Sequence, residues 1–563
     1  MNSAFWRSSL IRVAAALGIA VLISGTIDPA AAQRAPRVFT HADSLRGATT
    51  APARTWWDVT YYDLNVAVHP ADSTLAGFNR ITYRVLRPAQ QMQIDLMMPL
   101  ELDSITQDGR ALGVRRDGDA FLVTLVAPQR AGEQHTITAH YHGRPKTLPN
   151  DGFHWATDSL KRPWLMTVDQ GVGSSIWWPL KDSWADEPDS QRIAITVPDP
   201  LIQVSSGRQR RDVHNGDGTT TYEYFVRNPI NAYAVNVTAG QYAHLAESYF
   251  GEKGPLSLDF YPLDYHLAAA RKQFLQVRTM LQCYEHWFGP YPWYRDGYKL
   301  IEAPTTGMEH QTAITYGNNY ANGYRGRDVS STGLGLGWDY IIVHESAHEW
   351  FGNSITAQDQ RDMWIQEGFA SYAEGLFTEC LYGKAAGEDY IVGTRRNIRN
   401  DAPIELPQSG VGAPGSGDMY AKGASMLHTI RQLVGNDEKW RQVLRALSST
   451  FYHQVVTGTQ VEEFLSVRAG IRLDRVFDQY LRTTMIPTLE YRVDGSALSY
   501  RWIDVVPGFA MPVRVLLRDD DSRLIRPTTR WQTVRTTLTN GADIQIDRNF
   551  YVKSRNLGAQ GGT

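Results

Sequence analysis

The chain has 563 residues, of which 42% are hydrophobic and 20% are charged, a globular composition with room for about three domains. Its formal net charge is −3 and it contains no long basic run, which argues against a nucleic-acid partner.

The N-terminus has the pattern of an export signal. Arg7 and Arg12 precede an apolar run over 13–23, and three alanines follow at 30–32. This order predicts a cleaved signal peptide over residues 1–32. The alternative is an uncleaved anchor, but the apolar run is short for a membrane span. We expect a mature protein that begins with a linker over 33–55, has no membrane span and is periplasmic or secreted.

Residues 56–258 predict an antiparallel β domain. In YYDLNVAVHP, apolar residues alternate at Tyr62, Leu64, Val66 and Val68. The stretches FNRITYRVL, HTITAHYHG, RIAITVPDP and YAVNVTAGQY behave similarly, and Gly, Pro and Asp clusters separate them.

Residues 259–485 have a mostly helical pattern. Helical periodicity marks the stretches 265–289, 340–351, 363–383, 426–435 and 459–470. Thr459 and Glu462 form a capping-box pattern at the start of the last stretch. The segment contains both cysteines, Cys283 and Cys380. An oxidising compartment permits a bridge, but two cysteines are no framework, so we expect two unpaired, buried thiols.

Strands return over residues 486–563. Leu489, Tyr491 and Val493 alternate, a turn follows at Asp494 and Gly495, and a second alternating run begins at Leu498. This predicts a small C-terminal β-sandwich.

The stretch YIIVHESAHEWFGNSIT (340–356) places His344 and His348 four residues apart. On a helix both rings project from one face, with Glu345 about 100° round from His344. Two neutral imidazoles there can bind zinc, and the adjacent carboxylate can act as a general base. The alternative is a helix with two hydrogen-bonded histidines. We expect the helix to stop at Gly352 and Asn353.

A third ligand is available downstream. Glu367 lies in the first turn of the helix predicted over 363–383, and eighteen residues separate it from His348. A first-turn glutamate is also favoured by the helix dipole alone. Beside two histidines, it predicts a zinc site of His344, His348 and Glu367, with one position left for water.

This arrangement resembles the zinc signature of the aminopeptidase N family of gluzincin metallopeptidases. The stretches HEWFGN and WIQEGFASYAE agree with that family, as do TTGMEHQTAITYG, FGPYPW and YAKGASML. The resemblance covers nearly the whole mature chain. It implies an α+β multidomain fold with an N-terminal antiparallel β-sheet (saddle) domain, a thermolysin-like catalytic domain and a small C-terminal β-sandwich.

The resemblance also implies roles for individual residues. One Zn²⁺ per chain would polarise the scissile carbonyl, Glu345 would be the general base and Tyr420 would donate to the oxyanion. Glu309 would bind the free α-amine of a peptide, aided by Gln170. The alternatives are a packed aromatic at Tyr420 and a solvated strand residue at Glu309.

Other positions complete this expected site. Gly307 and Met308 would present backbone groups to the peptide, which would add as a strand. Glu309 would lie on an edge strand beside the zinc helix. His310 stands where the family usually has asparagine, and Glu349 where it usually has glutamine. We expect Glu349 to lie behind the ligands or at the surface. Glu374 would orient a zinc histidine or lie on a solvated face.

Three functions fit these residues. The first is a zinc aminopeptidase acting on peptides with a free N-terminus. The second is another zinc hydrolase, such as an endopeptidase or an epoxide hydrolase, and the amine-binding Glu309 argues against the endopeptidase. The third is a non-catalytic binding module. A complete set of His344, Glu345, His348, Glu367 and Tyr420 argues against it.

Overall fold

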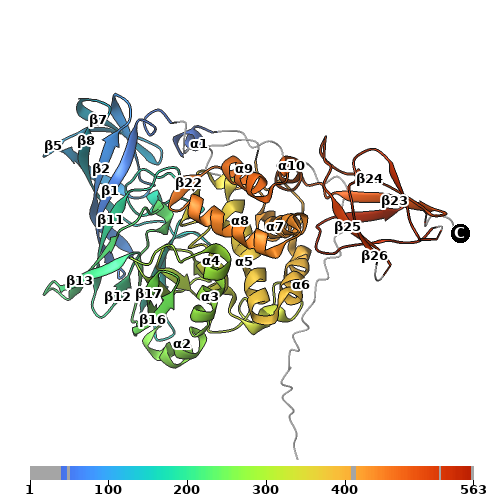
Figure 1. The fold of residues 1–563 in the computed structure, drawn as a ribbon. Coiled ribbons are helices and arrows are strands. Elements are labelled where there is room, and N and C mark those ends of the chain that lie inside the picture. Colours follow the sequence, from blue (N-terminus) through green and yellow to red (C-terminus); the bar gives the residue numbers. More distant parts are fainter. Residues whose placement is uncertain (1–39, 47–50, 407–413, 519–520, 540, 559–563) are drawn as a thin grey trace, which may run out of the picture. The chain divides into compact units, whose positions relative to one another are not determined.

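The computed structural model describes residues 40–46, 51–406, 414–518, 521–539 and 541–558 (Figure 1). The predicted signal peptide lies outside these residues. Within the predicted linker, the structure contains a short helix, α1 (His41–Arg46).

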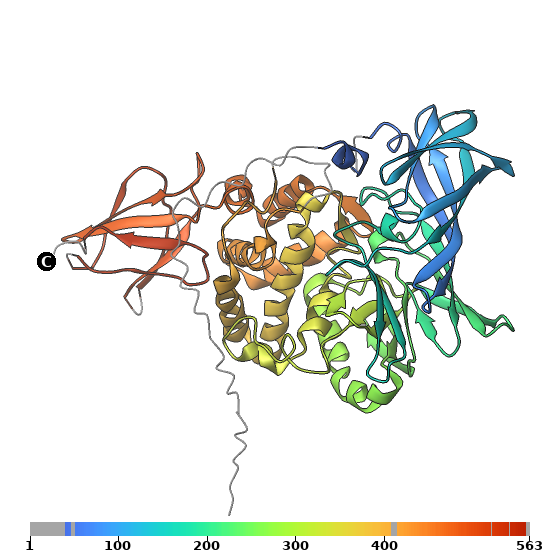
Figure 2. The same cartoon turned by 180° about the vertical axis from the view of Figure 1, so that it is seen from behind.

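An eight-stranded sheet occupies the N-terminal part. Its order is β13-β14-β11-β1-β2-β8-β4-β5, and β1 and β2 lie side by side in both views (Figures 1 and 2). All its pairs are antiparallel except β1 and β11, which run parallel. The strands are β1 (Trp57–His69), β2 (Thr74–Val85), β4 (Glu101–Gln107), β5 (Arg110–Ala111), β8 (Gln134–Gly143), β11 (Ser190–Pro198), β13 (Arg208–His214) and β14 (Thr219–Val226). The predicted alternation is confirmed, because Tyr62, Leu64, Val66 and Val68 are all buried.

Two smaller sheets share the core of this part. Their orders are β12-β15-β10-β9 and β3-β7-β6. The strands are β3 (Ala89–Asp95), β6 (Gly113–Asp117), β7 (Ala120–Gln129), β9 (Gly152–Thr157), β10 (Pro163–Val168), β12 (Ile202–Val204) and β15 (Thr238–Gly240).

A mixed five-stranded sheet follows, with the order β16-β17-β18-β20-β19. Its strands are β16 (Leu245–Gly251), β17 (Gly254–Tyr261), β18 (Tyr298–Glu302), β19 (Gly307–Met308) and β20 (Ile314–Tyr316). Strand β17 pairs with β18, so a boundary at residue 258 would cut a strand of this sheet. Leu245 and Tyr249 also pack in the same core cluster as the following helices. We therefore propose that the boundary between the first two domains lies near residue 244.

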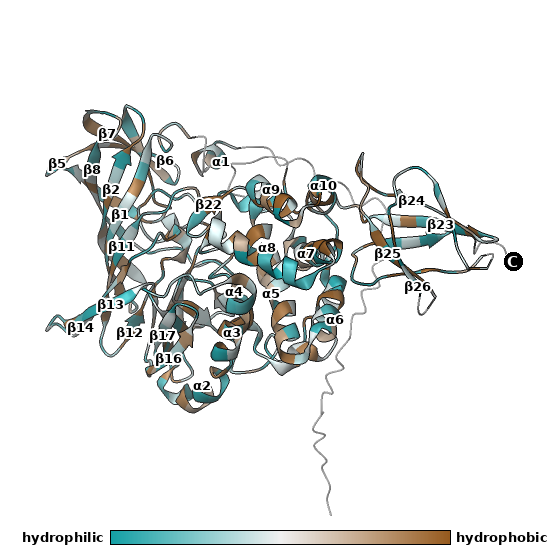
Figure 3. Cartoon of the chain, viewed as in Figure 1, coloured by the Kyte–Doolittle hydropathy of each residue, from teal (hydrophilic) through white to brown (hydrophobic). Residues whose placement is uncertain are grey.

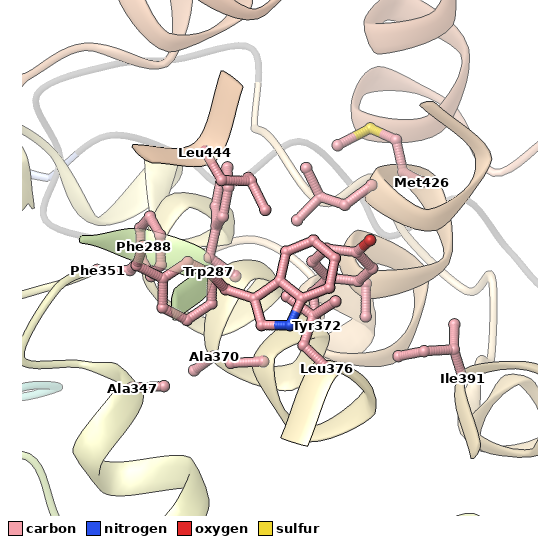
Figure 4. Packing of buried hydrophobic residues seen from close by; sticks show 14 of the residues in the cluster. Trp287, Phe288, Ala347, Phe351, Ala370, Tyr372, Leu376, Ile391, Met426 and Leu444 are labelled. Atoms are coloured by element: carbon pink, nitrogen blue, oxygen red, sulfur yellow. The ribbon is translucent and has the colours of Figure 1, made fainter. Parts of the chain in front are cut away.

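Ten α-helices are present among the described residues. Those after α1 are α2 (Leu267–Gln273), α3 (Gln276–Phe288), α4 (Tyr340–Ala347), α5 (Trp364–Tyr382), α6 (Lys384–Thr394), α7 (Ala421–Val434), α8 (Asp437–Thr450), α9 (Gly458–Ala469) and α10 (Asp474–Arg482). They carry both hydrophobic and hydrophilic residues, as amphipathic helices do (Figure 3). Their apolar faces meet in one core, to which Phe288, Tyr372 and Leu444 belong (Figure 4).

The predicted capping box is wrong by two residues. The N-cap of α9 is Thr457, and its side chain and that of Gln460 bond reciprocally to each other's backbone. Thr459 lies inside the first turn instead. The sequence contains the capping-box pattern twice, at Thr457 with Gln460 and at Thr459 with Glu462. Strand β22 (Gln454–Val456) ends immediately before Thr457, and this fixes where the helix can begin.

The prediction of unpaired thiols is also wrong. Cys283 on α3 and Cys380 on α5 form a disulfide, and their Cα atoms are 6.1 Å apart. Cys283 is buried but Cys380 is exposed. The pairing depends on how two helices 97 residues apart in sequence pack together, and local sequence does not record that packing.

The C-terminal part is built from two small sheets, β27-β24-β23-β29 and β26-β25-β28. The strands are β23 (Thr488–Asp494), β24 (Ala497–Ile503), β25 (Val513–Arg518), β26 (Asp521–Ile525), β27 (Gln532–Arg535), β28 (Gln545–Ile546) and β29 (Lys553–Asn556). The predicted hairpin is confirmed, with Leu489, Tyr491 and Leu498 buried. Elsewhere β21 (Ile355–Ala357) pairs with β22.

None of the described helices is long and apolar enough to cross a membrane.

Candidate active site

Helix α4 carries the first part of the site. Asp339 caps it, because its carboxylate accepts hydrogen bonds from the backbone N–H groups of Ile341 and Ile342, at 3.1 and 3.3 Å. The regular helix ends at Ala347, earlier than the predicted stop, and His348 is the C-cap. Turn hydrogen bonds continue beyond it, so His344 and His348 still share one face and their rings lie 5.0 Å apart.

Three ligand atoms converge at this face. The Nε2 atoms of His344 and His348 are 3.4 Å apart, and Glu367 Oε2 lies 3.4 and 3.5 Å from them. Ligands about 2.0–2.1 Å from a tetrahedral zinc ion are roughly 3.4 Å from one another. Glu367 Oε2 is buried and has no hydrogen-bond partner, which is an unusual state for a carboxylate oxygen. The three residues therefore fit a zinc ion.

The other ring nitrogens are held by the protein. His344 Nδ1 lies 2.8 Å from Glu374 Oε1, and His348 Nδ1 lies 3.0 Å from the carbonyl oxygen of Phe351. Tyr390 donates to the second oxygen of Glu374 at 2.7 Å. These contacts place the proton on Nδ1 and leave Nε2 free to bind a metal. Glu374 is buried, so the solvated alternative is wrong.

Glu345 lies against the edge strand of the five-stranded sheet. A Cβ atom at position 307 would come within 2.7 Å of Glu345 Oε1 and 2.9 Å of Ile341 Cγ2. Only glycine leaves this space, so β19 passes directly beside the carboxylate. The predicted edge strand is present, because β19 is the last strand of its sheet, but β19 ends at Met308 and Glu309 follows it.

Glu309 follows β19 and is buried. Its carboxylate accepts a hydrogen bond from the Gln170 side chain, which comes from the loop after β10. Two further contacts hold Gln170. Its backbone carbonyl oxygen accepts a hydrogen bond from Gln360 Nε2 at 2.8 Å, and its side-chain amide lies 3.3 Å from Gln366 Oε1. The structure thus brings Gln170 and Glu309 together, 139 residues apart in sequence. Glu309, Glu345 and His348 also form a tight group of their own.

Tyr420 lies at the N-terminus of α7, and its ring stacks 6.0 Å from that of His344. Its side chain is 37% exposed, so it is not a packed loop aromatic. The crossing of α5 and α7 brings it here. A Cβ atom at Gly423 would come within 3.0 Å of the Gly368 Cα, so two glycines allow the helices to meet. Gly368 is next to Glu367 in the chain.

The electrostatics of the ligand set suit a cation. Burial alone raises the pKa of Glu367, but His348 and His344 outweigh it and lower the pKa to about 2. Burial lowers the pKa of His348, but Glu367 and Glu309 raise it to about 9 overall. Positive charge is therefore favoured here, and a metal ion competes with protons for the same nitrogens. Burial raises the pKa of Glu309 to about 7.

The two positions at which this chain differs from the family's usual residues, Glu349 and His310, lie deep in the protein. Glu349 is fully buried, so a surface location is wrong. It accepts from the Thr312 N–H at 2.8 Å and the Tyr291 hydroxyl at 3.1 Å, and burial raises its pKa to about 8. His310 is buried as well, and burial lowers its pKa to about 3.

Sequence reasoning missed Tyr233 and Gln366. Tyr233 is buried, and its hydroxyl has no hydrogen-bond partner. Burial raises the pKa of its phenol well above the usual range, with Glu309 and Glu367 as further causes. It comes from a 3₁₀ turn in the N-terminal part (Ala232–Ala234), where no local pattern marks it. Gln366 directly precedes Glu367, and that adjacency was the available signal.

Comparison with known proteins places this site in a family. Residues 274–480 match the peptidase family M1 domain, and all three proposed ligands lie within the match. This part of the chain is similar to the peptidase family M1 domain. The match includes α3 to α9, the two ligand helices and Tyr420.

The curated relatives that this chain matches are aminopeptidases. It is 24% identical to aminopeptidase B of Rattus norvegicus over 67% of its own length and 56% of that protein. It is 29% identical to leucine aminopeptidase 2 of Vanderwaltozyma polyspora, over 58% of this chain and 48% of the relative. The chain therefore spans about half the length of these relatives.

Solved structures share the fold. An M1 zinc metallopeptidase variant from Deinococcus radiodurans, bound to a Tyr-Ser-Ala substrate, has a TM-score of 0.64 and 20% identity, covering 78% of this chain and 97% of that one. A two-domain M1 zinc metallopeptidase variant bound to L-tryptophan has the same TM-score and 21% identity, covering 76% and 94%.

Proposed function

We propose that the protein is a zinc aminopeptidase that hydrolyses the first peptide bond of peptides with a free N-terminus. The observation that carries this proposal is the joint placement of His344, His348 and Glu367 as a metal triangle with Glu345 and Glu309 beside it. The names of the aminopeptidase relatives support it. His344 Nε2, His348 Nε2 and Glu367 Oε2 would hold one Zn²⁺.

When bound, zinc supplies a Lewis acid for the scissile carbonyl and lowers the pKa of a water molecule. Glu345 takes the proton of the attacking water and delivers it to the leaving amine. The Tyr420 hydroxyl donates a hydrogen bond to the oxyanion that develops on the carbonyl oxygen. Gly307 and Met308, on the edge strand, pair with the peptide backbone and hold it alongside Glu345.

Glu309 selects the N-terminus. Its buried carboxylate pairs with the α-ammonium of the substrate, and the Gln170 amide holds the carboxylate in place. A charged hydrogen bond of this kind contributes about 1.5–3 kcal/mol. Because the pairing fixes the register, only the first peptide bond reaches the general base.

The test compares amino-acid anilides and short peptides, with free and with acetylated N-termini. We expect the wild type to cleave only the free substrates and to lose activity on exhaustive chelation. Glu309→Ala should strongly lower kcat/KM for free substrates and shrink the difference between the two classes. Glu309→Gln, which keeps the volume but removes the charge, should behave similarly. Equal cleavage of both classes by the wild type would favour an endopeptidase.

We also propose export to the periplasm or the medium, supported by the charged, apolar and small-residue order of residues 1–32. N-terminal sequencing of the mature protein should find a start after Ala32. An intact Met1 in the mature protein would contradict this.

A further inference from the structure

The C-terminal sheet β27-β24-β23-β29 has one solvent-facing side that collects positive charge. Arg492 is opposite Ser499, Glu490 is opposite both Arg501 and Arg555, and Arg535 is opposite Ala497. Side chains alternate between faces along a strand, so these residues share one face. The other face holds the buried Leu489, Tyr491, Leu498 and Trp502.

We name this side the basic face. It carries five cations from four neighbouring strands: Arg492, Arg501, Arg535, Lys553 and Arg555. Its carboxylates are Glu490 and Asp494. The whole chain has 56 Lys and Arg residues and 59 Asp and Glu residues. Residues 486–563 have eleven Lys and Arg residues and eight Asp and Glu residues. Positive charge is therefore concentrated in a part of a chain that is otherwise acidic.

The five cations differ in how they are held. Buried Glu490 pairs with Arg501 at 2.6 Å and with Arg555 at 3.6 Å. Arg492 is 52% exposed and pairs with the exposed Asp494, and Arg535 and Lys553 are exposed. Exposed pairs of this kind contribute little to stability. Arg492, Arg535 and Lys553 are therefore available to an outside partner.

An exposed tryptophan lies among these cations. Trp531 immediately precedes β27 and is 39% exposed. The guanidinium carbons of Arg501 and Arg492 lie 4.7 and 5.4 Å from its ring centroid. Cation–π contact holds both guanidinium groups in place, and a planar guanidinium can bind phosphate oxygens in pairs. The indole is an amphipathic side chain of the kind found at membrane–water interfaces.

We propose that the basic face docks the protein on an anionic phospholipid bilayer. The strands that carry the cations are about 4.8 Å apart, and same-face positions along one strand are about 6.6 Å apart, so the cations are spread in two dimensions rather than in a single row. A planar array of lipid phosphates can meet all of them together, whereas a linear polyanion follows one row at a time. Each Lys or Arg near such a surface adds to the attraction.

Vesicle partition tests this proposal with the full-length mature protein. The wild type should bind vesicles of phosphatidylglycerol and phosphatidylcholine but not vesicles of phosphatidylcholine alone, and 0.5 M salt should release it. The variant Arg492→Ser/Arg535→Ser/Lys553→Ser keeps both partners of Glu490. It should partition about 100-fold more weakly, because each of the three charges contributes about 1 kcal/mol, or roughly fivefold. Trp531→Ala should weaken binding too.

A matched control removes the same charge elsewhere. Arg110→Ser/Arg144→Ser/Lys146→Ser changes three exposed cations of the N-terminal part and should leave partition close to the wild type. Both triple variants should keep the wild-type peptidase activity and melting temperature. Equal partition of the two triple variants would overturn the proposal. So would wild-type binding to pure phosphatidylcholine, release by inorganic phosphate at constant ionic strength, or tighter binding to soluble polyglutamate than to the vesicles.

Discussion

At the scale of single residues, the two glutamates of HESAHE, Glu345 and Glu349, have separate tasks. Glu345 Oε1 lies beside β19 and faces the ligand set, while Glu349 accepts the Thr312 N–H and the Tyr291 hydroxyl. One carboxylate is placed to accept a proton, and the other holds the loop after β19. Substitutions at the two positions should therefore separate catalysis from structure.

Glu345→Gln should keep zinc and lower kcat by about 10²–10⁴-fold, because an amide cannot take the proton of water. Metal analysis and anilide turnover measure the two effects. Glu349→Gln is the matched control, since it makes the same chemical change and should keep most of the activity. Near wild-type turnover by Glu345→Gln would remove it as the base.

We propose that Glu374 acts on the metal through His344. Its Oε1 holds the imidazole Nδ1 at 2.8 Å, and Tyr390 holds its Oε2. Glu374→Ala should weaken zinc affinity about 10–100-fold, because the ring loses its fixed orientation and some basicity. Competition with a chelator of known affinity measures this. Tyr390→Phe should act in the same direction and more weakly. Unchanged zinc affinity in both variants would make Glu374 a packing residue only.

At the scale of elements, the contact of α5 with α7 brings the proposed ligand Glu367 and Tyr420 to the same site. Gly368 and Gly423 lie at the contact, where a Cβ atom at Gly423 would come within 3.0 Å of the Gly368 Cα. The crossing of the two helices therefore sets the distance between the Glu367 carboxylate and the Tyr420 hydroxyl, although these residues are 53 positions apart in the sequence.

Gly423→Ala should push α7 away from α5 and lower kcat more than it raises KM, because Tyr420 loses its place at the oxyanion. Zinc content should not change. Tyr420→Phe alone should lower kcat by about 10²–10³-fold. The double variant should be no slower than Tyr420→Phe, since both changes remove one interaction. Additive losses would mean that Gly423 acts elsewhere.

The sequence predicts what is local and leaves out what depends on packing. The spacing of His344, Glu345 and His348 on a helix, and the apolar alternation of β1, follow from the period of one element. The contacts of Gln170 with Glu309, of Glu374 with His344 and of Gly368 with Gly423 join separate elements, and no local pattern encodes them. The resemblance supplied Gln170, Glu309 and Tyr420, while periodicity alone supplied neither these residues nor Tyr233.

At the scale of the whole molecule, the disulfide encloses most of the site. The loop from Cys283 to Cys380 contains the five-stranded sheet from β18 onward, helix α4, and both Glu367 and Glu374. Tyr420 and Gln170 lie outside it. The bridge joins α3 to α5, so it limits how far the unfolded chain can separate the two ends of the segment that builds the metal site.

Cys283→Ala/Cys380→Ala should therefore lower the free energy of unfolding by about 2–5 kcal/mol, as expected for a loop of 97 residues. Urea titration followed by tryptophan fluorescence measures this, because Trp287, Trp350 and Trp364 are buried in the surrounding core. A thiol reductant should bring the wild type to the stability of the variant and leave the variant unchanged. Activity of the folded variant should stay close to the wild type, since neither cysteine touches the ligands. A variant as stable as the oxidised wild type would show that packing of α3 on α5, and not the bridge, holds this segment together.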